Sequence, residues 1–246
     1  MTLIFLKDEI NFKNTKPEFY DIDLNNIDFF IKENKIVGGV DKILLKATNY
    51  NKLDIVKYLL SNYTINTEAL SKALLETAMA DNIQLIKLLL DHGADINYNN
   101  GEALKSNIIS KCFTSVVYLV ERGADVNIKD KHGNTPLHTA CQYENFEIVK
   151  YLVEHGADIH AKNDEALILS IRKGNFEIVK YLISQKANIH ARNNEPLRLS
   201  LKHGHKNITS FLINECGDKL DITFDEIIDI ASQKGSLELL KYSVEN

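Results

Sequence analysis

Histidine is the residue type whose positions in this chain first suggest chemistry. His160 and His190 lie 30 residues apart, and His203 and His205 flank Gly204. Imidazole nitrogens are common zinc ligands, so each pair is a candidate for part of a metal site. Whether a pair can hold a metal depends on the elements that carry it.

Cysteine and glycine supply weaker candidates. Cys112, Cys141 and Cys216 are odd in number and widely spaced, without the close pairs of a zinc site, and they indicate a reducing compartment. Gly38-Gly39 lacks the Lys-Ser or Lys-Thr that follows in a phosphate-binding loop. His138 has no nucleophile or carboxylate placed beside it by the sequence. The sequence therefore predicts no catalytic site and no cofactor.

The stretch 130–158 shows what kind of element carries these residues. Thr135 and Pro136 are typical of a helix start, because threonine caps free N–H groups and proline fits the first helical position. Asn145 can cap a second helix, and Gly156 suits the left-handed residue that ends it. The second helix carries an apolar stripe, Ile148, Val149, Leu152 and Val153. Such a helical hairpin cannot bury both of its faces without neighbours.

Copies of this hairpin recur along the chain. The run Asn-Phe-Glu-Ile-Val occupies residues 145–149 and again 175–179, and Gly-Ala-Asp occurs at 93–95, 123–125 and 156–158. A period of 30 to 33 residues is typical of a solenoid, in which each repeat packs only on its neighbours.

One family combines these features. Gly133, the run Thr135-Pro136-Leu137-His138, Ile148-Val149 and Gly156-Ala157-Asp158 together resemble the ankyrin repeat family. The resemblance covers residues 41–246. It implies an all-α solenoid of helix-turn-helix repeats, and it implies that His138 makes structural hydrogen bonds around the turn.

The repeats can be counted from the positions equivalent to Leu137. These are Leu44, Leu74, Leu104, Leu167 and Leu197, with Ile227 or Ile228 in the last unit. We therefore expect seven helical hairpins in residues 41–246. Residues 1–40, with one amphipathic helix near 26–32, are expected to be an N-terminal capping segment or a degenerate repeat, because terminal repeats are normally atypical.

Two details of the junctions follow from spacing. Tyr63, Lys186 and Cys216 replace the glycine that ends the second helix, so those turns must be strained or remodelled. The other detail is length: Asp125 is 12 residues before Leu137, whereas the equivalent intervals elsewhere are 9. In the ankyrin family the longer connection projects a β-hairpin finger, so only 128–134 is expected to form one. With most of its fingers missing, the repeat array of this chain resembles the ankyrin arrays found in some large DNA viruses.

The repeat frame also decides the histidine question. His160 and His190 fall at equivalent junction positions, where the family often has asparagine. Repeats about 10 Å apart are too widely spaced for both to bind one zinc ion at about 2 Å. Gly204 and His205 are equivalent to a turn glycine and to a helix-capping asparagine. We therefore expect turn roles for these residues, and no metal.

In the ankyrin family, partners are mostly proteins held on the concave face, by finger tips and by exposed positions of the first helix. The residues five and six positions after Leu137 and its equivalents mark that stripe. It comprises Asn49, Tyr50, Met79, Ala80, Ile109, Ser110, Gln142, Tyr143, Arg172, Lys173, Lys202, His203, Gln233 and Lys234, with Lys131 and His132 on the finger beside it. The stripe becomes cationic along the chain, which favours a partner with an acidic surface. The alternative is that these charges are only solvated helix residues.

Three functions are therefore open. The first is a protein-binding scaffold. The second is an adaptor that recruits a host enzyme, such as a ubiquitin ligase, through residues 1–40; some viral ankyrin proteins do this through an F-box-like C-terminus. The third, an enzyme, is disfavoured by the missing catalytic groups.

Composition agrees with a soluble interaction module. The chain is 44% hydrophobic and 26% charged, and its net charge of −5 disfavours general nucleic-acid binding. Its apolar opening, residues 1–6, is too short for a membrane span and lacks a basic leader. We expect a cytoplasmic monomer, in the host cytoplasm if the chain is viral, with the nucleus as an alternative location.

Overall fold

The computed structural model describes residues 27–32, 39–77 and 81–216. Several predictions concern residues outside these ranges. They are the seventh hairpin near Ile227, the stripe residues Met79, Ala80, Gln233 and Lys234, and most of residues 1–40 with the adaptor role assigned to them. The described residues form α1 (Ile27–Lys32), α2 (Gly39–Asn49), α3 (Leu53–Asn62), α4 (Thr67–Glu76), α5 (Ile83–Asp91), α6 (Tyr98–Ile109), α7 (Phe113–Glu121), α8 (Pro136–Gln142), α9 (Phe146–Glu154), α10 (Ala161–Lys173), α11 (Phe176–Ser184), α12 (Ala191–His203) and α13 (Lys206–Cys216).

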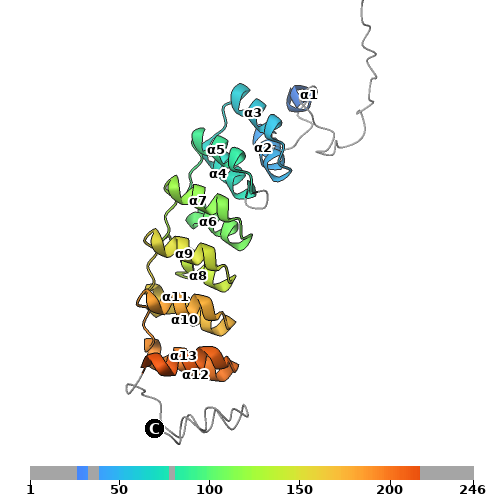
Figure 1. Ribbon diagram of the computed structural model, residues 1–246. Coiled ribbons are helices and arrows are strands. Elements are labelled where there is room, and N and C mark those ends of the chain that lie inside the picture. Colours follow the sequence, from blue (N-terminus) through green and yellow to red (C-terminus); the bar gives the residue numbers. More distant parts are fainter. Residues whose placement is uncertain (1–26, 33–38, 78–80, 217–246) are drawn as a thin grey trace, which may run out of the picture. The chain divides into compact units, whose positions relative to one another are not determined.

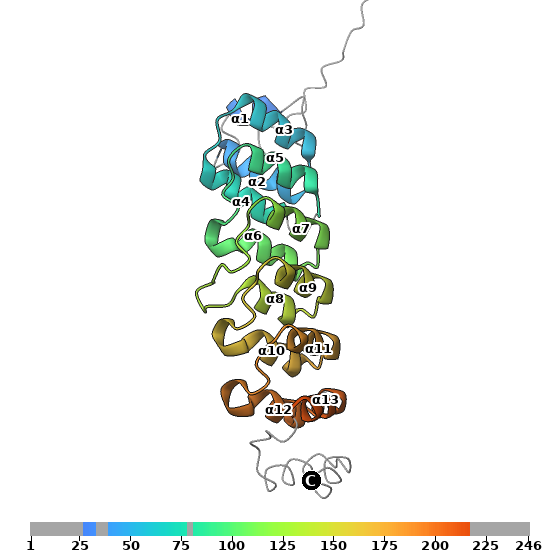
Figure 2. The ribbon, with the colours of Figure 1, turned by 60° about the vertical axis from the view of Figure 1, so that its left-hand side comes forward.

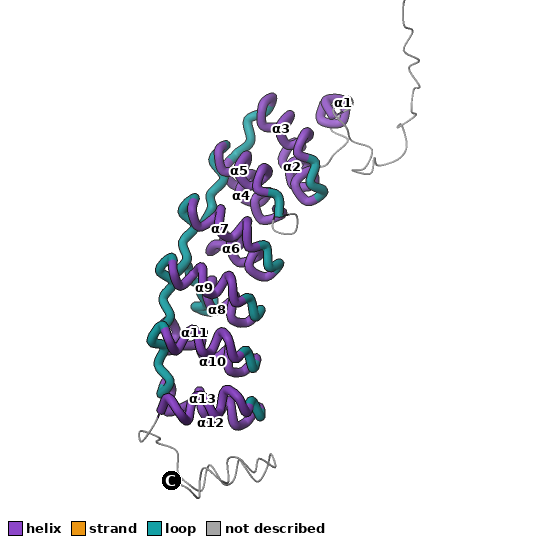
Figure 3. Tube along the Cα trace, in the orientation of Figure 1, coloured by secondary structure: helices purple, strands orange, loops and turns teal. Residues whose placement is uncertain are grey.

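These helices confirm the all-α prediction. Six antiparallel pairs, α2–α3 through α12–α13, follow one another along the described chain, and no strand occurs in it (Figure 3). The chain divides into two compact units, residues 1–95 and 96–246, which we call unit 1 and unit 2 (Figure 1).

Unit 2 is built in two layers. Its first helices, α6, α8, α10 and α12, contact one another in order, and so do its second helices, α7, α9, α11 and α13 (Figure 2). Unit 1 repeats the scheme, with α2 against α4 and α3 against α5. Each hairpin therefore completes its burial against its neighbours, as a solenoid requires.

The repeat frame predicted from Leu137 is the frame of the core. All six described positions of that phase are at most 2% exposed: Leu44, Leu74, Leu104, Leu137, Leu167 and Leu197. The asparagine caps predicted for the second helices also form. The Asn145 Oδ1 atom accepts a hydrogen bond from the Ile148 N–H at 3.1 Å, and Asn175 does the same for Ile178.

An aromatic ladder joins the second helices of unit 2. Phe113, Phe146 and Phe176 each begin a helix, and each meets an aromatic ring of the next repeat edge-on. The centroid separations are 5.8 Å to Tyr151, 5.7 Å to Tyr181 and 5.6 Å to Phe211. Edge-to-face pairs of this kind add to the hydrophobic contact between repeats.

The single full-length junction of unit 2 forms the predicted finger. Its tip is a tight turn, in which the Gly133 N–H donates to the Asp130 carbonyl and the Asp130 N–H to the Asn134 carbonyl, both at 2.9 Å. No residue of it is assigned to a strand, so the finger is a turn-like loop rather than a regular β-hairpin. Figure 2 shows it leaving the stack between α7 and α8.

The three fingerless junctions of unit 2 share a feature that the spacing did not predict. Each contains one left-handed turn of three consecutive residues with positive φ: Asn99-Asn100-Gly101, Lys162-Asn163-Asp164 and Arg192-Asn193-Asn194. Each turn is closed by a hydrogen bond over four residues, as from the Gly101 N–H to the Asn97 carbonyl at 3.0 Å. A left-handed residue costs about 1–2 kcal/mol unless it is Gly, Asn or Asp, which explains why those types dominate.

The left-handed turns also explain why a proline, Pro196, is tolerated within α12. By its hydrogen-bonding pattern α12 is continuous from Ala191 to His203. The right-handed part of α12 begins only after Asn194, so Pro196 falls in its first turn. A missing N–H costs nothing there.

Successive junctions are tied by side-chain to backbone hydrogen bonds. The Asn97 Oδ1 atom accepts the Asp125 N–H at 2.9 Å, and Asn127 Oδ1 accepts the Asp158 N–H at 2.7 Å. At position 160 a histidine replaces this asparagine, and the side chain that accepts the hydrogen bond is then Asp164, four residues later. Asp164 Oδ1 accepts the Asn188 N–H at 2.8 Å and lies 3.0 Å from His160 Nδ1.

The three helix ends without glycine behave differently. Lys186 keeps the left-handed conformation, with φ of 76°, so this turn is strained. Tyr63 instead adopts extended backbone, with φ of −133°, so this turn is remodelled. Helix α13 runs to Cys216, where the described residues end.

His138 holds its own repeat to the next one. Its Nδ1 atom accepts the Thr135 N–H at 2.8 Å, so the proton lies on Nε2, which donates to the Ala161 carbonyl at 3.3 Å. The Thr135 hydroxyl is 3.1 Å from the same Nδ1, but both side chains are at most 2% exposed. The structural role implied for His138 is therefore the one it has.

Burial also lowers the pKa of His138, and this outweighs the carbonyl of Ala161 and the charge of Glu165, which favour the protonated ring.

Strain at Lys186 gives the first prediction. Lys186→Gly should raise the free energy of unfolding by up to about 1 kcal/mol, because glycine adopts this φ without steric conflict. The matched reverse change is Gly156→Lys at the same turn of the preceding repeat, where φ is 87° and no atom lies within 4 Å of an added Cβ. It should lower stability by a similar amount. Urea unfolding measures both, and equal stability of all three chains would contradict the assignment of strain.

The second prediction concerns acid. Because the folded state holds His138 neutral with a lowered pKa, its contribution is complete above about pH 6.5 and is lost as the pH falls below that value. His138→Gln should therefore weaken the fall in the free energy of unfolding between about pH 7.5 and 5.5. The control is Leu152→Ala, which should cost about 2–5 kcal/mol at both values, because it removes buried apolar contact and no titrating group. An unchanged pH slope in His138→Gln would refute the prediction.

Candidate functional site

A groove of about 680 Å³ opens on unit 2 where the finger lies beside a fingerless junction. Its walls come from the left-handed turn and body of α6, the finger, α8 and α10. It is lined by Asn99, Asn100, Glu102, Lys105, Ile109, Asp130, Lys131, Asn134, His138, Thr139, Gln142, Tyr143, Glu165 and Leu169. This volume lies within the range of protein ligand pockets, about 300–1,000 Å³.

Asp130 organises the finger wall. Its Oδ1 atom accepts the N–H groups of His132 and Asn134, both at 2.8 Å, and its Oδ2 atom accepts the Asn134 amide at 3.2 Å. Burial alone raises the pKa of Asp130, but these hydrogen bonds and the positive charge of Lys105 outweigh it and lower the pKa overall. The carboxylate therefore stays ionised and keeps the tip in shape.

The apolar part of the groove is made by side chains that a folded monomer usually covers. Ile109 at the end of α6 is 41% exposed, and Tyr143 just after α8 is 42% exposed. Both line the groove, together with Leu169 of α10. Exposed aromatic and aliphatic groups that line a concave surface are typical of binding sites.

The polar part is mixed in charge. Glu102 and Lys105 lie one turn apart on α6, and Glu165 is held by an ion pair with Arg192. Lys105 is only 6% exposed, although lysine is rarely buried.

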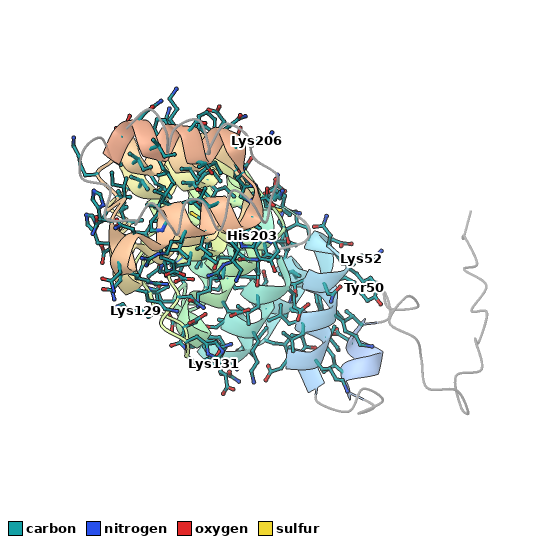
Figure 4. The ribbon with its side chains drawn as sticks, turned by 90° about the horizontal axis from the view of Figure 1, so that it is seen from below. Tyr50, Lys52, Lys129, Lys131, His203 and Lys206 are labelled. Carbon is teal, nitrogen blue, oxygen red and sulfur yellow. The ribbon has the colours of Figure 1, made fainter. Side chains whose placement is uncertain are left out.

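Four of the predicted binding residues meet in this groove, namely Ile109, Lys131, Gln142 and Tyr143. His132 lies beside them on the finger and is exposed. Figure 4 labels Lys131 on the finger and His203 at the end of α12. The structure therefore brings together members of the predicted stripe from the end of α6, the finger and the end of α8.

The other described members lie outside the groove. Arg172 and Lys173 end α10, and Lys202 and His203 end α12; all four are exposed. A guanidinium nitrogen of Arg172 is 3.9 Å from Glu195. In unit 1, Tyr50 is 43% exposed, while the Asn49 amide donates to Glu76 at 2.9 Å.

Groove residues such as Lys105, Glu102 and Glu165 were not predicted. Lys105 was detectable in principle, because it occupies the position in its repeat that His138 occupies in the next.

The histidine pairs are engaged locally. His160 Nδ1 contacts Asp164, and His190 Nδ1 contacts Asn194 Oδ1 at 2.6 Å, each within its own junction. The rings of His203 and His205 stack with centroids 5.8 Å apart. No group of three potential metal ligands occurs among the described residues.

Cys141 is fully buried, and burial raises the pKa of its thiol to about 12 despite a hydrogen bond with Ser170. A thiol with such a pKa stays protonated and unreactive at neutral pH.

Within the part of the chain that the structure describes, no helix is both long and apolar enough to cross a membrane.

Comparisons with known proteins agree with the fold. The family model described as ankyrin repeats in three copies matches residues 43–130, 110–193 and 167–245. An ankyrin repeat and KH domain-containing protein of Caenorhabditis elegans, mask-1, is 29% identical over 121 residues, which are 48% of this chain and 5% of that protein. An ankyrin repeat protein of Rickettsia felis is 27% identical over 148 residues, or 55% of this chain and 39% of its own length.

An ankyrin repeat protein of Fowlpox virus is 31% identical over 112 residues, which are 42% of this chain and 33% of the viral protein. The chain thus spans well under half the length of each of these relatives. The family model, in contrast, covers most of the chain, and its period coincides with the helix pairs of the structure. The chain belongs to the ankyrin repeat family.

Proposed function

We propose that this protein binds another protein on the first-helix face of unit 2, meaning the exposed surface of α6, α8, α10, α12 and the finger. Ankyrin repeats are generally protein–protein interaction modules. The family resemblance supports this face, because it implies that partners are held by the first helices and the finger. The observation that carries the proposal is the groove beside the finger, with Ile109 and Tyr143 exposed along it.

The groove supplies the anchor of the proposed contact. Tyrosine is among the residues that contribute most to interface affinity, because it buries a large rigid ring and keeps a polar tip. Tyr143 follows the last residue of α8, and its exposed ring lines the groove. A partner side chain in the groove would cover Tyr143 and Ile109 together.

The cationic end of the face supplies attraction. Arg172, Lys173 and Lys202 are exposed on successive first helices, on a chain whose net charge is −5. Charges at the edge of an interface act mainly on the rate of encounter and on its salt dependence. An acidic partner surface fits this end of the face best.

The described residues give no support to an enzymatic role, since His138 and Cys141 are both buried and occupied. The role that we propose for this protein is that of a non-enzymatic scaffold or adaptor, which acts as a cytoplasmic monomer. Similarity to a Fowlpox virus protein makes a host cytoplasm one setting for it.

The test begins with a partner identified by proximity labelling in the native cell. Tyr143→Ala should speed its dissociation, at a cost of about 1–2 kcal/mol, because it removes an anchor. Lys173→Glu with Lys202→Glu should slow association and flatten its salt dependence, leaving the fold intact. Binding kinetics at two salt concentrations separate these effects.

The control reverses two exposed charges on the second helices, Lys150→Glu with Lys180→Glu. It should leave both rate constants nearly unchanged. If this control abolishes binding while the first-helix variants bind like the wild type, the proposed face is wrong.

A further inference from the structure

Lys105 is the one groove residue whose state the fold itself does not explain. The residue is only 6% exposed and lines the groove, and its side chain forms no hydrogen bond or ion pair with any described residue. Its Nζ atom is not among the enclosed polar atoms without a partner, so the ammonium at the end of the buried stem is the part that reaches the groove. A lysine whose residue is almost completely covered is rare unless its charge is paired, and here no group of the described chain pairs with it.

The same position in the neighbouring repeats shows what a satisfied side chain looks like there. His138 uses both ring nitrogens, Ile168 is apolar and fully buried, and Arg198 donates to the Asn193 carbonyl at 2.6 Å. Lys105 alone of these four presents an ionic group to the groove without a hydrogen bond.

The acidic groups that line the groove either have other partners or lie beyond ion-pair distance of Lys105. The charge of Lys105 helps to lower the pKa of Asp130, but the two carboxylate oxygens of Asp130 already accept three hydrogen bonds from the finger. Glu165 is paired with Arg192. Glu102, one turn before Lys105 on α6, does not approach it within ion-pair distance.

We propose that the groove receives a carboxylate of the partner protein, an aspartate or glutamate side chain, and that Lys105 binds it. This proposal deepens the proposed function and rests on it. A carboxylate would give the Lys105 ammonium a charge-assisted hydrogen bond in a poorly solvated place, where such bonds are strong.

The surroundings define the rest of the motif. Ile109, Tyr143 and Leu169 offer apolar contact next to Lys105. Glu102 also lines the groove, so a second adjacent acidic group would meet a like charge. The motif that fits is therefore a single acidic residue beside an aromatic or aliphatic one, rather than an acidic run.

The test uses the full chain and displayed random peptides as the probe. Selection on the wild-type chain should enrich peptides with one acidic residue next to an apolar one. The best peptide should bind the Lys105→Met variant at least about tenfold more weakly, as expected for the loss of one member of a buried charged pair. Changing its acidic residue to the amide should cause a similar loss in the wild type and little further loss in Lys105→Met.

Two controls keep this result specific. Lys150→Met removes a charge from α9, outside the groove, and should bind the peptide like the wild type. Lys105→Met keeps the aliphatic stem and removes a charge that has no partner among the described residues, so its thermal unfolding should match or exceed that of the wild type. Lys105→Gln repeats the test if the first variant fails to fold.

Enriched peptides without an acidic residue, or equal affinity for Lys105→Met, would overturn the inference. So would binding that requires a phosphorylated residue in place of the carboxylate. If acid-free peptides bind and are lost in Tyr143→Ala, the proposed face stands and only the role of Lys105 fails. If peptides are lost only through Lys150→Glu with Lys180→Glu, both proposals fail.

Discussion

Each helical hairpin of this chain is stable because a neighbouring hairpin covers the face that it cannot bury by itself. The leucines equivalent to Leu137 are buried in every described repeat, and the aromatic ladder of the second helices adds contacts that cross from repeat to repeat. Stability in such a stack is a sum of local terms and interfaces. One consequence is that a junction can change its shape, provided that it still delivers the next hairpin in register.

The junctions of unit 2 use that freedom in two ways. The full-length junction builds a finger around Asp130, whereas each short one closes a left-handed turn from residues such as Asn99 and Asn100. The groove lies where these two kinds of junction adjoin, because a finger stands there beside a junction that has none. The candidate binding site is therefore a product of unequal loop lengths on an otherwise regular stack.

The sequence predicted what depends on repetition. It predicted the buried leucines equivalent to Leu137, the helix caps at Asn145 and Asn175, and the finger of unit 2, since each depends on residue types at a fixed spacing. The left-handed turns were not, because Lys162 and Arg192 have no preference for positive φ and only the closed turn imposes it. The transfer of the acceptor from position 160 to Asp164 also escaped prediction, because it depends on a contact with the following repeat.

The candidate site was less predictable than the fold for a physical reason. Positions that repeat build the stack, so periodicity finds them; recognition depends on positions where one repeat departs from the others. The position of Tyr143, six residues after Leu137, was enough to place it on the first-helix face. The groove around it could be found only once the shapes of the neighbouring junctions were known. Lys105 shows the principle most clearly. Its position is structural in the next repeat, where His138 uses both ring nitrogens, whereas lysine at the same position places a charged group on the groove.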